Sequence, residues 1–114
     1  MKNLSESEVY KIANPIWESM SSASNSGDYE KFISHFSTEL KELITKERFE
    51  SQAKEFPLLT SLKNNAMPVA CIRRSEGTTV IYKQLSSALE GEFIGQLTLK
   101  KTKNGCEVVN AQVY

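Results

Sequence analysis

The spacing of apolar residues changes once along the chain, near Pro68. Before this point apolar residues recur every three or four positions, as on one face of a helix. After it they alternate with polar residues, as in strands. Helices followed by strands indicate an α+β fold, with helices packed on one face of a four-stranded antiparallel sheet. We expect one domain over residues 1–114, with helices over about 5–66 and strands over about 68–114.

Capping residues mark where the helices begin. Ser5-Glu6-Ser7-Glu8 is a capping box, and Pro15 predicts a kink in the long helix that follows it. Asp28 and Thr45 each cap a later helix, a further turn begins at Ser37 or Thr38, and Pro57 ends the Thr45 helix or bends it. The apolar stripe of the first helix is Val9, Ile12, Ala13, Ile16, Trp17, Met20 and Ala23, and that of the Asp28 helix is Tyr29, Phe32, Ile33 and Phe36.

The last two strands form a hairpin whose register decides which side chains are buried. A two-residue Asn104-Gly105 loop would place Leu99 opposite Asn110, an apolar side chain opposite an amide. A three-residue loop, Lys103-Asn104-Gly105 with a left-handed Gly105, places Leu99 opposite Val109 instead. We therefore predict the three-residue loop, with Lys101 opposite Glu107 on the polar face. The four predicted strands are Val69–Arg74, Thr78–Leu85, Glu92–Lys101 and Glu107–Tyr114.

Composition narrows the classes of partner. Lys and Arg together number 14, as do Asp and Glu, so the balanced charge favours neither nucleic acid nor an anionic membrane as a partner. No apolar run approaches the roughly 20 residues of a membrane span, and the first residues lack the apolar core of a signal peptide. We expect a cytoplasmic protein, or an exported one whose leader is absent. Cys71 and Cys106 are interpreted as small buried residues, with a disulfide between their strands as the alternative.

The chain contains no phosphate loop, zinc-ligand spacing, nucleophile elbow or dinucleotide fingerprint. We therefore expect no metal or cofactor and assign no catalytic residue. His35, the one histidine, is interpreted as a solvated flank of its helix, and the alternative is a general base at a pocket rim. Of Arg73 and Arg74, one side chain either points toward the helices or lies at a sheet edge. An inward arginine could clamp a carboxylate or phosphate ligand or pair with a buried acid, although we favour a side chain that reaches solvent at the strand end.

The Trp17 helix is followed by Gly27-Asp28-Tyr29, then by Phe32 and Phe36-Ser37, and finally by a closing Gly105–Val109 strand. This order resembles the nuclear transport factor 2-like superfamily, also called SnoaL-like or cystatin-like, and most of all its small bacterial members. The resemblance implies a curved sheet wrapped around the first helix, with a cone-shaped pocket between them. It also implies homodimers formed through the open sheet face. Cys106 lies at or beside the position where these relatives carry a tryptophan.

Some members of that superfamily are isomerases, dehydratases or cyclases with Asp, His or Tyr in the pocket, and others only bind ligands or proteins. We predict a ligand- or protein-binding module for a small apolar or amphipathic ligand. An isomerase- or dehydratase-like enzyme using His35, and a purely dimerising or interacting protein, are the alternatives. The residues that we expect around the pocket are Trp17, Tyr29, Phe32, Phe36, Arg73, Tyr82 and Leu97.

Overall fold

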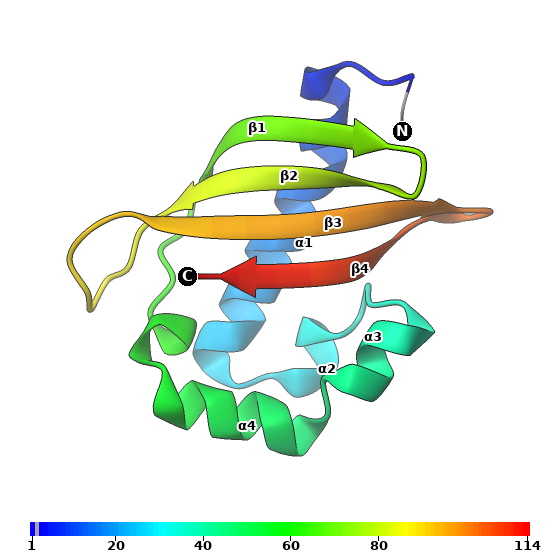
Figure 1. Ribbon diagram of the computed structural model, residues 1–114. Helices are drawn as coiled ribbons and strands as arrows, with labels where there is room; N and C mark the ends of the chain where they lie inside the picture. The colour runs from blue at the N-terminus through cyan, green and yellow to red at the C-terminus, as the bar shows by residue number, and fades with distance from the viewer. Residues whose placement is uncertain (2) are drawn as a thin grey trace.

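In the computed structural model, which describes residues 1 and 3–114, helical segments precede four strands (Figure 1). This order confirms the predicted α+β class. The helical segments are α1 (Glu6–Ser26), α2 (Tyr29–Phe32), α3 (Thr38–Leu43), α4 (Lys46–Glu55) and the 3₁₀ turn η1 (Pro57–Thr60). The strands are β1 (Met67–Arg74), β2 (Gly77–Gln84), β3 (Phe93–Thr102) and β4 (Gly105–Val113).

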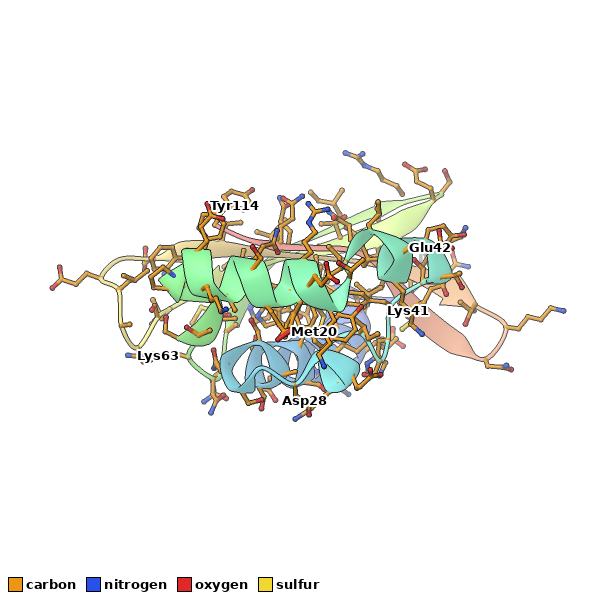
Figure 2. The ribbon with its side chains drawn as sticks, turned by 90° about the horizontal axis from the view of Figure 1, so that it is seen from below. Met20, Asp28, Lys41, Glu42, Lys63 and Tyr114 are labelled. Atoms are coloured by element: carbon orange, nitrogen blue, oxygen red, sulfur yellow. The ribbon has the colours of Figure 1, made fainter. Side chains whose placement is uncertain are left out.

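The four strands form one curved, open antiparallel sheet in the order β1-β2-β3-β4. Helix α1 crosses behind the strands and covers one face, which we call the inner face, while α2, α3 and α4 lie beyond β4 (Figure 1). Seen from below, Met20 of α1 lies on the side of the sheet that the helices cover, and Tyr114 lies at the sheet (Figure 2). The opposite face, which we call the outer face, has no helix over it.

Local sequence explains both ends of α1. The Ser5 hydroxyl accepts a hydrogen bond from the Glu8 N–H, and the Glu8 carboxylate accepts one from the Ser5 N–H, so the predicted capping box is formed. At the other end Gly27 has φ 74°, a left-handed conformation that glycine adopts without a steric cost. Pro15 lies inside the helix but does not end it.

The second helix is shorter than its apolar spacing predicts. Asp28 caps α2 as expected, but α2 ends at Phe32. The chain then pairs with β4, because the Val108 N–H donates to the His35 carbonyl and the Ser37 N–H donates to the Val108 carbonyl. Phe36 therefore leaves the helix to form a bridge at the sheet edge. Backbone pairing with β4 replaces the hydrogen bonds that a longer helix would have made.

The predicted β3–β4 loop is wrong in length. Thr102 pairs with Gly105, so the loop has two residues, Lys103 and Asn104, although Gly105 does take a positive φ of 145°. Further from the turn, Leu97 pairs with Ala111, which is the register that the three-residue loop would give. A register shift between Thr98 and Leu99 reconciles the two halves of the hairpin, and it leaves Val109 unpaired as the extra residue of a β-bulge.

Trp17 is the central side chain of the core. Its ring stacks on Tyr82 with centroids 5.0 Å apart, and its Nε1–H donates to Gln84 Oε1 at 2.9 Å. The same ring lies directly over Gly95, where a Cβ atom would be 2.5 Å from Trp17 Cζ2. The residues that complete the core around it are Val9, Ala13, Ile16, Met20, Phe36, Leu40, Val80, Leu97, Leu99 and Val108.

Candidate functional site

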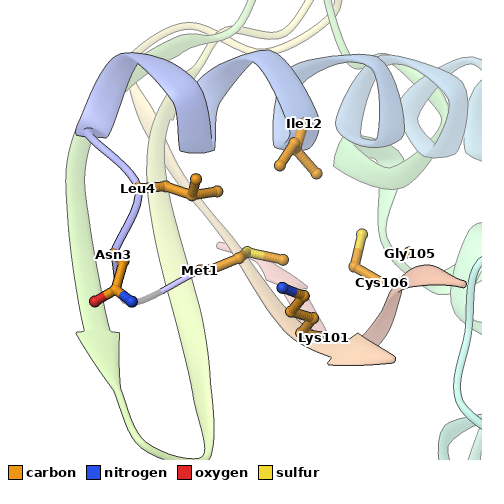
Figure 3. Close-up of a pocket in the computed structure, with 7 residues that line it drawn as sticks. All are labelled: Met1, Asn3, Leu4, Ile12, Lys101, Gly105 and Cys106. Atoms are coloured by element: carbon orange, nitrogen blue, oxygen red, sulfur yellow. The ribbon is translucent and has the colours of Figure 1, made fainter. Parts of the chain in front are cut away.

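A cavity lies on the inner face, between the N-terminal segment, α1 and the β3–β4 hairpin (Figure 3). We call it the hairpin pocket. Its volume is about 520 Å³, within the range of sites that hold small organic ligands. Its lining residues are Met1, Asn3, Leu4, Ile12, Lys101, Gly105 and Cys106.

The hairpin register decides which strand side chains enter this pocket. Along β3 the buried side chains Leu97 and Leu99 alternate with less buried ones, and Lys101 is the next residue on their side. Because of the bulge at Val109, the residue opposite Lys101 is Cys106 and not Glu107. The prediction that Lys101 faces Glu107 on the polar face is therefore wrong, and Lys101 lines the pocket on the inner face.

The two reactive groups of the hairpin pocket are an amine and a thiol. Among the described residues, no carboxylate lies within ion-pair distance of the Lys101 ammonium, and none accepts a hydrogen bond from it. Burial raises the pKa of the Cys106 thiol. The thiol is therefore protonated near neutral pH and is a poor nucleophile. The remaining walls are mostly apolar.

A smaller cavity of about 180 Å³, which we call the tryptophan pocket, opens beside the Trp17–Tyr82 stack. The Tyr82 hydroxyl donates to Asn14 Oδ1 at 2.8 Å, and burial raises the pKa of this phenol well above its usual range. Tyr82 thus stays protonated and cannot act as a base near neutral pH. The other residues at this pocket are Glu18, Asn65 and Ala66.

The structure separates the residues that the sequence predicts around one pocket. Trp17 and Tyr82 meet at the tryptophan pocket, and none of the predicted set lines the hairpin pocket. Leu97 is fully buried in the core. The Arg73 side chain donates to the Leu4 carbonyl at 2.7 Å, so this arginine ties the N-terminal segment to β1.

Tyr29, Phe32 and Phe36 belong to an aromatic cluster with Phe49, at the end of the molecule where α2 and α4 meet. Phe32 contacts both Phe36 and Phe49, with ring centroids 5.3 and 4.8 Å apart. The Tyr29 hydroxyl donates to the Ile44 carbonyl at 2.6 Å. The rings pack against one another, and the Tyr29 hydroxyl is hydrogen-bonded to the backbone, so the cluster holds the helices together.

His35 and the two cysteines do not form a reactive centre. His35 is exposed, and its Nδ1 lies 3.2 Å from the Ser34 hydroxyl. Over residues 1 and 3–114 no carboxylate forms an ion pair with this ring, and no group of three acidic, histidine or cysteine side chains could hold a metal. Cys71 on β1 and Cys106 on β4 are free thiols on the two edge strands, which excludes a disulfide within the chain.

Comparison with known proteins adds no relative. A scan against protein-family models finds no match, and a search of curated proteins finds none either. The resemblance to the nuclear transport factor 2-like superfamily therefore stays a prediction. Within the described part of the chain, no helix is long and apolar enough to cross a membrane.

Proposed function

We propose that the protein is a binding module that takes a small, largely apolar ligand in the hairpin pocket. The observation that carries this proposal is the 520 Å³ cavity beside an otherwise closely packed core. Ligand sites in proteins are concave and mostly apolar, with few polar groups that fix orientation. Leu4, Ile12 and Cys106 supply apolar walls here, and Lys101 supplies one polar group.

Binding without catalysis fits the chemistry of the groups near both cavities. A general base must titrate near the working pH and lie within reach of the proton that it takes. Burial shifts the Cys106 and Tyr82 pKa values upward, away from neutrality, and His35 contacts neither cavity. These three observations favour a binding role over an isomerase- or dehydratase-like one.

The test compares two variants that introduce the same side chain at different places. Ile12→Trp fills the hairpin pocket, whereas Ile72→Trp adds an equal volume to the exposed outer face. We expect the neutral fluorescent probe N-phenyl-1-naphthylamine to bind the parent protein and Ile72→Trp, and to lose affinity at least tenfold for Ile12→Trp. Equal binding by all three proteins, or no binding by any of them, would contradict the proposal.

A second candidate function, self-association through the outer face, is favoured by a separate observation. Four apolar side chains on this face are exposed in the isolated chain: Met67 (59%), Ile72 (45%), Ile94 (43%) and Tyr114 (56%). Exposed apolar patches on a sheet commonly mark protein contacts. Sedimentation equilibrium tests the idea with Ile94→Lys against the matched control Leu43→Lys, which lies on α3. We expect a dimer that only Ile94→Lys dissociates, and a monomeric parent protein would refute it.

A further inference from the structure

Among the described residues that line the hairpin pocket, Lys101 has the one cationic side chain, and its neighbours are Asn3 and mostly apolar walls. This combination identifies a class of ligand. We propose that the pocket binds an amphipathic anion, with its apolar chain in the cavity and its carboxylate on the Lys101 ammonium. This inference rests on the proposed ligand-binding function and names the chemistry of the ligand. The carboxylate of a fatty acid is the simplest group that has this combination.

The position of Lys101 is the first argument. Lys101 pairs with Cys106 across the hairpin, and its side chain lies on the inner face, where it points into the space bounded by Met1 and Cys106 (Figure 3). Among the described residues Lys101 has no ion-pair partner, although Lys83 elsewhere on the sheet pairs with Glu92 at 2.9 Å. An anionic head group placed at Lys101 would supply the missing partner through a charge-assisted hydrogen bond.

The charge around the pocket mouth is the second argument. The two turns at this end of the sheet span residues 73–77 and 100–107, and they contain five basic and two acidic side chains, a local charge of +3 in a chain with net charge zero. Glu6 and Glu8 in the first turn of α1 offset part of this charge, since the Glu8 carboxylate stays negative while it accepts the Ser5 N–H. They bring the local balance from +3 to +1, which is still positive. The local field therefore favours an anion at this end.

The apolar walls are the third argument. Met1, Leu4 and Ile12 give the cavity an apolar side that a hydrocarbon chain can cover. Each methylene that such a chain buries should raise the affinity by about fourfold, until the cavity is full. A ligand with a charged head and a short tail would leave this surface in water, so affinity should depend on both parts of the molecule.

Calorimetry with four probes separates these contributions. Octanoate and decanoate vary the chain, while decan-1-ol and decyltrimethylammonium keep the ten-carbon chain and change the charge of the head. We expect decanoate to bind most tightly and decyltrimethylammonium least. Lys101→Gln should weaken decanoate about fivefold and leave decan-1-ol unchanged. Lys103→Gln, two residues further along and outside the lining, is the matched control. It removes the same charge from this end of the sheet and should weaken decanoate clearly less than Lys101→Gln does.

The cysteines report where the probe sits. Decanoate in the hairpin pocket should slow alkylation of Cys106 by iodoacetamide, while Cys71, on the opposite edge strand, reacts at its unliganded rate. If the parent protein binds decanoate and decan-1-ol with equal affinity, and Lys101→Gln has no effect, the ligand is not an anion held by Lys101. The proposed binding function would still stand. Binding of decanoate without protection of Cys106 would also refute the inference. Failure of every probe, including N-phenyl-1-naphthylamine, would refute the proposed function itself.

Discussion

Gly95→Ala tests whether the contact between Trp17 and the sheet is as tight as the structure shows. The added Cβ would lie 2.5 Å from Trp17 Cζ2 and 2.9 Å from Cη2, well inside normal contact distance. The ring is 5% exposed, stacks on Tyr82 and is hydrogen-bonded to Gln84, so moving it toward the adjoining tryptophan pocket would break the stack and the hydrogen bond. The substitution must therefore displace the indole or bend β3.

The expected cost follows from three contributions. Overpacking of a filled core costs about 1–3 kcal/mol, and weakening the buried indole hydrogen bond adds about 1 kcal/mol. Replacing glycine by alanine restricts the unfolded chain, which offsets about 0.4–1 kcal/mol of this. We therefore expect Gly95→Ala to lower the free energy of unfolding by about 2 kcal/mol, a fall in Tm of about 8 °C for a chain of this size.

Urea denaturation followed by the emission of Trp17, the one tryptophan, measures both the stability and the environment of the ring. A double-mutant cycle with Trp17→Phe supplies the control, because the smaller ring does not extend as far over Gly95. Since Trp17→Phe leaves no tryptophan, the unfolding of all four proteins of the cycle is followed by far-UV circular dichroism. Gly95→Ala should then cost clearly less in the Trp17→Phe background. A change within about 0.5 kcal/mol of the parent protein, the size of an ordinary surface substitution, would show that the contact between Trp17 and Gly95 is not tight.

Three further predictions follow from other contacts. Gln84→Leu should lower the free energy of unfolding by about 2 kcal/mol in urea, because the buried amide accepts one hydrogen bond and donates two to backbone carbonyls; an unchanged midpoint would contradict this. Hydrogen bonds from Ser5 lower the pKa of Glu8. The ionised carboxylate therefore stabilises the folded state at pH values above 4.5, the ordinary pKa of glutamate, and this stabilisation is lost as the pH falls below that value. The difference in Tm between the parent protein and Glu8→Ala should therefore shrink on acidification, and a constant difference would refute the capping role. Under non-reducing, denaturing conditions Cys71 and Cys106 should both titrate with a thiol reagent, and the absence of two free thiols would contradict their placement on opposite edge strands.

Features that depend on neighbouring residues could be predicted from the sequence. The capping box at Ser5 and the caps at Asp28 and Thr45 form as expected, because each side chain bonds to a backbone group three residues away. The change from helical to strand spacing near Pro68 likewise gave the order of the layers. The length of α2 was not predictable in this way, since its end is set by backbone pairing with Val108, far along the chain.

The hairpin pocket was missed because three separated segments build it. Its walls come from the N-terminal segment, from Ile12 on α1 and from the β3–β4 hairpin, and no local pattern joins them. One signal was present. Lys101 continues the alternation of Leu97 and Leu99 and so had to face inward, a position that is unusual for a lysine. The residue opposite Lys101 could not be predicted, because the bulge at Val109 shifts the register of β4 by one residue and a shift of one exchanges the two faces of a strand.

The hydrogen bond between Trp17 and Gln84 joins residues 67 positions apart, and this separation has a consequence for synthesis on the ribosome. The capping box lets α1 form as soon as it emerges, but the strands that cover its apolar stripe follow later. At about 5–20 residues per second the delay is roughly 3–13 s, during which Trp17 has no partner from the sheet. The sheet itself is a series of neighbouring hairpins that can close quickly once translated. During this delay the apolar stripe of α1 lacks the sheet that covers it in the finished protein, so the nascent chain exposes more apolar surface than the finished protein does.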